Sequence, residues 1–279
     1  MKMKILRTVS DLRSFRTGLS GSVGLVPTMG FLHEGHLSLV CQCKTNCHHT
    51  LVSIFVNPTQ FGPNEDFNTY PRDIERDLTL LEATGVDAVF LPSVEEIYPP
   101  GADTLVVPGK VAERLEGAVR PGHFKGVATV VLKFFNLVQP HRAYFGQKDA
   151  QQVAVIQKMI TDLNLPVDLI VMPTVREADG LAMSSRNSYL NTTERQAAAI
   201  LYQALTKAGN LISLGERDTE IIKRSMTELI NTEALAAIDY ISIADAASLE
   251  ELPFFRKPAL ILLAVCIGKT RLIDNIKLS

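Results

Sequence analysis

Residues 23–36 have the sequence VGLVPTMGFLHEGH, and this stretch decides the fold. Its first four residues form an apolar run that predicts a buried strand, and a helical pattern begins after it at Leu37. In an open parallel sheet, ligands bind at the carboxyl ends of the strands, where the next helix offers N–H groups and a partial positive charge to phosphates. We therefore expect a nucleotide to bind at this turn.

The alternation of strand and helix continues to about residue 173. Apolar runs separated by helical patterns are typical of a parallel sheet covered by helices on both faces. We predict a Rossmann-like α/β domain over residues 1–173. The further expected strands are 51–56, 87–91, 143–145 and 167–172, and the expected helices are 37–47, 73–83, 127–138 and 150–163.

A different order of elements begins at residue 174. Two helical patterns precede two or three consecutive strands, which is typical of an α+β unit. We predict a smaller C-terminal α+β domain over residues 174–279. The expected helices are 193–208, opened by a capping box of Thr193 and Gln196, and 219–230, and the expected strands are 240–243, 259–267 and 271–276.

The composition argues against several classes of protein. The chain has 279 residues, 46% hydrophobic and 21% charged, as in ordinary globular proteins. Its net charge of -2 argues against sequence-independent nucleic-acid binding, which needs an excess of Lys and Arg. The most apolar stretch, 259–267, is about half as long as a membrane-spanning helix, and no signal-peptide run follows the first residues. The four cysteines form no disulfide pattern, so we expect a cytoplasmic protein. From the charge and the short apolar stretch we expect that it binds neither nucleic acid nor a membrane.

Two histidines stand at the start of the helix after the first strand. His33 and His36 are three residues apart, so they can face the same side of the helix and donate hydrogen bonds to phosphoryl oxygens. Gly30 and Gly35 permit a ligand to approach the backbone closely. Either histidine alone would more simply be a solvent-exposed or core residue near a turn, but the pair at this position favours phosphate binding.

A second polar segment, GLAMSSRN at 180–187, follows the last strand of the first predicted domain. Its small hydroxyl side chains beside Arg186 suit the polyphosphate of a nucleotide, because arginine stabilises charge on a phosphoryl group during displacement. A surface linker with one solvated arginine explains the same residues equally well when the segment is considered alone.

Several motifs together carry a family resemblance. H-x-G-H followed far downstream by M-S-S-R resembles the paired signatures of the nucleotidylyltransferase and class I aminoacyl-tRNA synthetase superfamily. In that superfamily both elements bind ATP. Six longer motifs, in order and at the right separations, resemble the pantothenate synthetase (pantoate–β-alanine ligase) family across nearly the whole chain. They are PTMGxLHxGH at 27–36, SIFVNPTQF at 53–61, YPR at 70–72, PGHFKGV at 121–127, FGQKDxQQ at 145–152 and DGLAMSSRNxYL at 179–190.

The resemblance implies an activity and its partners. The family condenses pantoate with β-alanine in coenzyme A biosynthesis, using ATP with Mg²⁺ and releasing AMP and pyrophosphate through a pantoyl adenylate. It also implies a homodimer whose C-terminal domain closes over the ATP site. Such chemistry needs no covalent nucleophile, and the sequence has no G-x-S-x-G element and no cysteine within the matched motifs.

The resemblance also assigns site residues by their positions in the motifs. His33, His36, Lys148 and Arg186 are expected to be catalytic, with His36 as a proton donor. The residues expected to bind ATP are Met29, Gly30, Phe31, Leu32, His33, Glu34, Gly35, His36, Gly146, Gln147, Lys148, Asp149, Val175, Met183, Ser184, Ser185 and Arg186.

The remaining assignments concern the other substrates and the metal ion. Gln60 and Gln152 resemble the family's two glutamines that bind pantoate, and an amide suits that task because it both donates and accepts hydrogen bonds. Asp77 is a candidate ligand of Mg²⁺, with a solvated acid on a helix face as the alternative. Residues 120–125 resemble the mobile wall of the family's active site, and an ordinary connecting loop fits them equally well.

Three further hypotheses stay open. Cys41, Cys43 and Cys47 followed by His48 and His49 have the residue types of a zinc site, although we expect the cysteines on the helix to pack on the sheet as small apolar residues. A nucleotidylyltransferase would share H-x-G-H and the fold, but it would need a strongly basic acceptor pocket. A non-catalytic nucleotide- or RNA-binding module is disfavoured by the near-neutral charge and the retained catalytic residue types.

Overall fold

The computed structural model describes residues 3–279. Contacts between residues divide the chain into two compact units. The first contains the residues up to Gly146 together with Val155–Pro173, and the second contains Gln147–Ala154 together with Thr174–Ser279. The short segment after residue 146 therefore belongs with the C-terminal part of the chain, although it lies between stretches of the first unit in the sequence.

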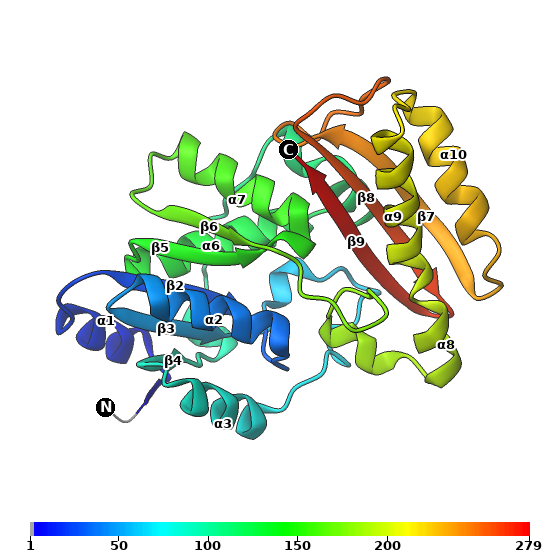
Figure 1. The fold of residues 1–279 in the computed structure, drawn as a ribbon. Coiled ribbons are helices and arrows are strands. Elements are labelled where there is room, and N and C mark those ends of the chain that lie inside the picture. Colours follow the sequence, from blue (N-terminus) through cyan, green and yellow to red (C-terminus); the bar gives the residue numbers. More distant parts are fainter. Residues whose placement is uncertain (1–2) are drawn as a thin grey trace. The chain divides into compact units, whose positions relative to one another are not determined.

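The first unit is built on a six-stranded parallel sheet with the strand order β1-β4-β3-β2-β5-β6 (Figure 1). This confirms the predicted parallel sheet, and it adds one edge strand, β1, that the sequence pattern does not indicate. The strands are β1 Lys4–Leu6, β2 Val23–Thr28, β3 His49–Ile54, β4 Ala88–Phe90, β5 Arg142–Gly146 and β6 Asp168–Met172.

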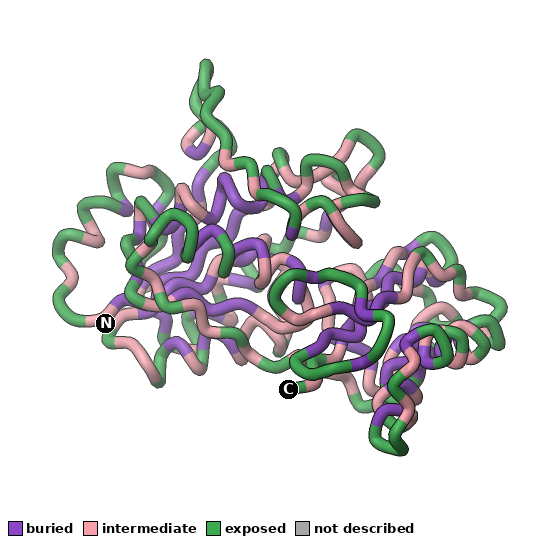
Figure 2. The backbone as a smooth tube through the Cα atoms, turned by 90° about the horizontal axis from the view of Figure 1, so that it is seen from above, coloured by how far each residue is buried: buried purple, intermediate pink, exposed green. Residues whose placement is uncertain are grey.

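Helices pack on both faces of this sheet, because successive side chains of a strand point to opposite sides. Val89 lies in one buried cluster with Leu39 of α2 and Leu81 of α3. The next residue, Phe90, contacts Phe134 of α6 with ring centroids 6.0 Å apart. Figure 2 shows the strands as a buried layer flanked by partly exposed helices. The helical segments up to residue 162 are α1 Val9–Thr17, α2 Glu34–Asn46, η1 Pro58–Gln60, α3 Ile74–Thr84, α4 Val94–Ile97, η2 Lys110–Ala112, α5 Glu116–Val119, α6 His123–Val138, η3 Gln147–Asp149 and α7 Ala150–Asp162.

The strand order changes direction next to β2. The chain places β3 on one side of β2, whereas β5 pairs with β2 on the other side. In open α/β sheets such a switch point is where ligands bind, at the carboxyl ends of the strands. Because β2 ends at Thr28 and β5 ends at Gly146, the motifs at 27–36 and 145–152 both include the ends of the two strands that flank this point.

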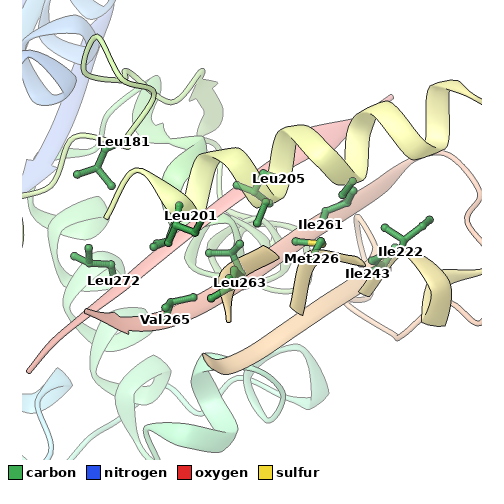
Figure 3. Packing of buried hydrophobic residues seen from close by; sticks show 14 of the residues in the cluster. Leu181, Leu201, Leu205, Ile222, Met226, Ile243, Ile261, Leu263, Val265 and Leu272 are labelled. Atoms are coloured by element: carbon green, nitrogen blue, oxygen red, sulfur yellow. The ribbon is translucent and has the colours of Figure 1, made fainter. Parts of the chain in front are cut away.

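The second unit contains an antiparallel sheet in the order β7-β8-β9 and two long helices. The helices pack on the sheet through Leu205 of α9, Met226 of α10 and Leu263 of β8, which lie in one buried cluster (Figure 3). This confirms the predicted smaller α+β architecture. The elements are η4 Ser185–Tyr189, α8 Thr192–Ala197, α9 Ile200–Ser213, α10 Thr219–Ile230, β7 Ala236–Asp245, β8 Ala259–Ile267 and β9 Thr270–Leu278.

The expected capping box of Thr193 and Gln196 is wrong. The capping residue is Asn191, whose side chain accepts hydrogen bonds from the N–H groups of Thr193 and Glu194, while the Glu194 carboxylate accepts from the Asn191 N–H. The expected single helix is also two helices, α8 and α9. Among the described residues, 3–279, there is no helix long and apolar enough to cross a membrane.

Candidate active site

The loop between β2 and α2 has a backbone conformation that few residue types adopt. Gly30 has a φ of 82° and Phe31 a φ of 51°, so two consecutive residues are left-handed. A Cβ at Gly30 would lie 2.9 Å from Ile54 Cγ2 and 3.0 Å from an Asp77 carboxylate oxygen, which explains why glycine is needed here. Thr28 supports the start of the loop, because its hydroxyl accepts from the Gly30 N–H at 3.2 Å.

Asp77 of α3 fixes the same loop through hydrogen bonds to its backbone. Its two carboxylate oxygens accept hydrogen bonds from the N–H groups of Phe31 and Leu32, each at 2.7 Å. The residue is 0% exposed, so the alternative of a solvated acid on a helix face is wrong. Burial raises the pKa of Asp77. The hydrogen bonds from the two N–H groups favour the ionised form and oppose this rise only in part. The observed task of this carboxylate is therefore to fix the turn that precedes His33.

We expect Asp77→Asn to lower the free energy of unfolding by about 1–3 kcal/mol, because the N–H group of either Phe31 or Leu32 would then face an amide N–H instead of an acceptor. Urea denaturation of the variant measures this difference. Glu75→Gln, an exposed change in the same turn of α3, is the matched control and should change stability by less than about 1 kcal/mol. Equal midpoints for the two variants would contradict the role assigned to Asp77.

The two histidines form the N-terminal cap of α2. His33 Nδ1 accepts from the Gly35 N–H at 3.1 Å, and His36 Nδ1 accepts from the His33 N–H at 3.4 Å. The two rings lie beside each other, with centroids 4.1 Å apart. Since Nδ1 is the acceptor in both rings, the neutral imidazole carries its proton on Nε2 in each case. The cap therefore orients two Nε2–H donors at a helix N-terminus, where phosphate oxygens are stabilised.

Gln60 is held at the end of η1 by its neighbours in the same unit. Its amide donates to Met29 Sδ at 3.2 Å, and its side-chain oxygen accepts from Asn57 Nδ2 at 3.1 Å. Asn57 is buried and also donates to the Gly126 carbonyl at 3.1 Å. The structure thus brings Gln60 to the ATP-site candidate Met29, and it identifies Asn57, within the SIFVNPTQF motif, as a supporting residue that sequence reasoning does not assign.

The segment 120–125 is tied to the Gln60 loop. Arg120 donates to both carboxylate oxygens of Glu65, at 2.8 and 2.6 Å. His123 Nδ1 lies 2.8 Å from the Gln60 carbonyl oxygen, and Arg120 Nη1 lies 3.2 Å from His123 Nε2. Because the carbonyl can only accept and the guanidinium can only donate, His123 is neutral with its proton on Nδ1. Burial and the charge on Arg120 lower the pKa of His123 to about 4.

This lowered pKa predicts acid sensitivity. Between pH 6.5 and about 4 the unfolded chain binds a proton at His123 and the folded chain does not, so stability falls as the pH falls through this window. We expect the contribution of His123 to this fall to reach up to about 3 kcal/mol. His123→Asn keeps a donor toward the Gln60 carbonyl and cannot titrate, so urea denaturation at pH 7 and pH 4 should show a smaller fall for the variant. Identical pH dependence in both proteins would contradict the prediction.

In the second unit, Lys148 lies in the turn η3. Its ammonium group lies 3.3 Å from Asp149 Oδ1, and its side chain is 19% exposed. The backbone carbonyls of Gln147 and Lys148 both accept hydrogen bonds from Asn275 Nδ2, at 3.0 and 2.8 Å. Gln152 follows in the first turn of α7, so the polar residues of the 145–152 motif beyond Gly146 lie in this unit.

The other predicted ATP-binding segment of this unit is a short hairpin followed by η4. The Met183 N–H donates to the Val175 carbonyl at 3.0 Å, and Arg176 pairs with Ala182. Ser184 caps η4, because its hydroxyl accepts from the Arg186 N–H at 3.3 Å. Ser184, Ser185 and Arg186 are therefore carried by a turn with defined hydrogen bonds.

Asp274 and Asn275 of β9 connect these two segments, and sequence reasoning does not assign either residue. Asp274 binds Arg176 of the hairpin in a bidentate pair at 2.6 and 3.0 Å, while Asn275 binds the Lys148 turn. Both residues lie far downstream of the motifs, so no local pattern could reveal them.

Of the three cysteines at 41–47, Cys43 packs as a buried apolar residue. Cys43 is 0% exposed within the core of the first unit, as expected, and burial raises its pKa to about 12. Cys41 is exposed, and Cys47 lies 3.6 Å from the Tyr144 hydroxyl. Within residues 3–279 no group of three or more His, Cys, Asp or Glu side chains is arranged to hold a metal ion.

Sequence comparisons match nearly the whole chain. The family model described as Pantoate-beta-alanine ligase matches residues 4–277. A pantothenate synthetase of Roseiflexus castenholzii is 57% identical over 273 residues, which cover 98% of each chain. A second pantothenate synthetase, from Herpetosiphon aurantiacus, is 58% identical over 275 residues, which cover 98% of this chain and 99% of the relative.

Solved structures give the same result. The crystal structure of pantothenate synthetase from Thermus thermophilus has a TM-score of 0.95 and 46% identity, and it covers 99% of both chains. The pantoate-beta-alanine ligase of Francisella tularensis, solved in complex with beta-gamma ATP and beta-alanine, has a TM-score of 0.81 and 37% identity and covers 99% of this chain and 97% of its own.

Proposed function

The chain belongs to the pantoate–β-alanine ligase family, and we infer from this premise that it condenses pantoate with β-alanine to pantothenate, using ATP. The observation that carries this inference is the family match over residues 4–277. AMP and pyrophosphate are the other products.

The reaction has two displacements. A carboxylate oxygen of pantoate attacks the α-phosphorus of ATP, pyrophosphate leaves, and pantoyl adenylate forms. The uncharged amine of β-alanine then attacks the acyl carbon, AMP leaves with the bridging oxygen, and the nitrogen loses a proton as the amide forms. No covalent enzyme intermediate is needed, so catalysis comes from positioning and from stabilising charge on the phosphates.

We assign the first displacement in part to His33 and His36. Their capping bonds direct Nε2–H donors at the N-terminus of α2, which suits phosphate oxygens that gain charge as pyrophosphate departs. His36 is the proposed proton donor. Met29, Gly30, Phe31, Leu32, Glu34 and Gly35 complete the proposed ATP contacts of the first unit, together with Gly146.

The second unit contributes the other nucleotide contacts in this proposal. Lys148 supplies a point charge to the phosphate chain, and Arg186 supplies a planar fork of donors. Both lie on turns whose backbones are fixed by hydrogen bonds, which supports a role in positioning charge. Gln147, Asp149, Val175, Met183, Ser184 and Ser185 are the remaining proposed ATP contacts.

Gln60 and Gln152 are the proposed pantoate ligands. The side chain of Gln60 accepts a hydrogen bond from Asn57 and donates one to Met29, so its amide has a defined orientation. An oriented amide distinguishes the hydroxyl and carboxylate oxygens of pantoate, because it offers a donor and an acceptor at fixed positions.

Mg²⁺ enters this proposal bound to ATP. It would neutralise phosphate charge, and it usually retains water ligands and takes few protein carboxylates. Both oxygens of the candidate ligand Asp77 already accept backbone hydrogen bonds, and the side chain is buried, so this residue does not fit a direct metal contact. We also propose a homodimer in the cytoplasm, as the family resemblance implies.

The assay that tests the function follows AMP and pyrophosphate in mixtures of ATP, Mg²⁺, pantoate and β-alanine from which each component is omitted in turn. We expect AMP release to require pantoate and β-alanine together, and ATP–pyrophosphate exchange to require pantoate alone. Folded protein that catalyses no exchange with pantoate would overturn the proposal and favour a nucleotidylyltransferase.

A further inference from the structure

Asn275 has a buried side-chain amide that forms hydrogen bonds with the turn η3. It is 3% exposed and lies in β9, paired with Leu262 of β8. Its Nδ2 donates to the carbonyls of Gln147 and Lys148 at 3.0 and 2.8 Å, and its Oδ1 accepts from Gln147 Nε2 at 3.1 Å. All of the hydrogen-bonding groups of this amide are therefore used by the turn that carries Lys148.

The strand that carries Asn275 is itself anchored. Neighbouring side chains of a strand point to opposite faces, and Asp274 shares the helix-facing side with Leu272 of the buried cluster. Asp274 binds Arg176 in a bidentate pair, and the Arg176 guanidinium lies 4.2 Å from the centroid of the Tyr202 ring in α9. β9 thus provides a fixed base from which the amide of Asn275 reaches the turn.

We propose that Asn275 is a positioning residue for adenylate formation, acting through Lys148. The inference rests on the proposed function, in which Lys148 binds the phosphates of ATP. Lysine has a flexible four-carbon stem, so the placement of its charge depends on where its backbone begins. Without Asn275 the carbonyls of Gln147 and Lys148 lose their buried donor and the turn moves, and a displacement of about 1 Å at such a residue costs on the order of 10²-fold in rate.

The test is a double-mutant cycle between Asn275 and Lys148. Asn275→Ala removes the three hydrogen bonds, and Asn275→Asp additionally places acceptor oxygens against two carbonyls. Each is measured in the wild-type background and in Lys148→Met. Lys277→Ala, an exposed change on the same face of β9, is the matched control. Thermal unfolding of every variant records its stability.

We expect Asn275→Ala to lower kcat/KM for ATP by about 10- to 100-fold, Asn275→Asp to lower it further, and the KM for pantoate to stay unchanged. In the Lys148→Met background either change should have an effect of less than about 2-fold, because residues that act as one unit are not additive. If Asn275→Asp does not fold, Asn275→Ala and Asn275→Ser complete the same cycle.

Two results would overturn the inference, and they are distinguishable. An undiminished loss of activity in the Lys148→Met background would show that Asn275 does not act through Lys148, and it would leave the assignment of Lys148 intact. Wild-type activity in Lys148→Met alone would remove the assignment of Lys148 and the inference that rests on it.

Discussion

His36→Ala is expected to lower kcat/KM for ATP by about 10²–10³-fold, because it removes a phosphate donor from the N-terminus of α2. The same change deletes the acceptor that caps the His33 N–H at 3.4 Å, so loss of activity alone would not separate catalysis from capping. Steady-state kinetics with ATP as the varied substrate measures the loss.

Two further variants of His36 make that separation. Asparagine places an oxygen near the position of Nδ1 and preserves the cap without a group at Nε2, whereas glutamine places an amide donor near Nε2 and loses the cap. We expect His36→Gln to retain more activity and His36→Asn to retain more stability. Near wild-type activity in His36→Asn would contradict the role assigned to Nε2.

Lys148→Met is expected to lower kcat/KM for ATP by a similar factor, about 10²–10³-fold, because it removes the charge and keeps the length of the side chain. Lys158→Met on α7 is the matched control. Lys158 is exposed and pairs with Asp162 one turn away, so its replacement should leave the kinetics unchanged. A loss of equal size in both variants would indicate a nonspecific effect of charge and contradict the assignment.

The elements with strong periodicity could be predicted from the sequence. The apolar runs at 23–26, 51–56 and 259–267 mark β2, β3 and β8, because their residues are almost all buried. By contrast β1 has three residues and α1 buries only Leu12, so neither gives a pattern that stands out from a loop. The residues 191–196, NTTERQ, contain two overlapping capping patterns, and the pattern that begins with Asn191 is the one that forms.

Some residues of the candidate site could be predicted from local sequence motifs, whereas the residues that support them could not. The positions of His33, His36 and Gln60 follow from motifs next to strand ends, which a sequence displays directly. Their supports do not, because Asp77 lies 45 residues from Leu32 and Asn275 lies 127 residues from Lys148. A buried asparagine or aspartate has no local signature until its partners are known, so these residues become visible only in the folded chain.

The division of the 145–152 motif between the two units could also not be predicted from the sequence. Gly146 ends β5 in the first unit, whereas Gln147–Ala154 belongs with the C-terminal residues. The reason is the set of hydrogen bonds between Asn275 and the turn η3, which fixes this short segment to β9.

The measurement that tests the central claim most directly is the transfer of oxygen from pantoate to AMP. Pantoate labelled with ¹⁸O in both carboxylate oxygens is incubated with ATP, Mg²⁺, β-alanine and the protein, and the products are analysed by mass spectrometry. An acyl-adenylate route leaves one ¹⁸O in AMP and one in the amide of pantothenate. Unlabelled AMP, or ¹⁸O in inorganic phosphate released with ADP, would contradict it.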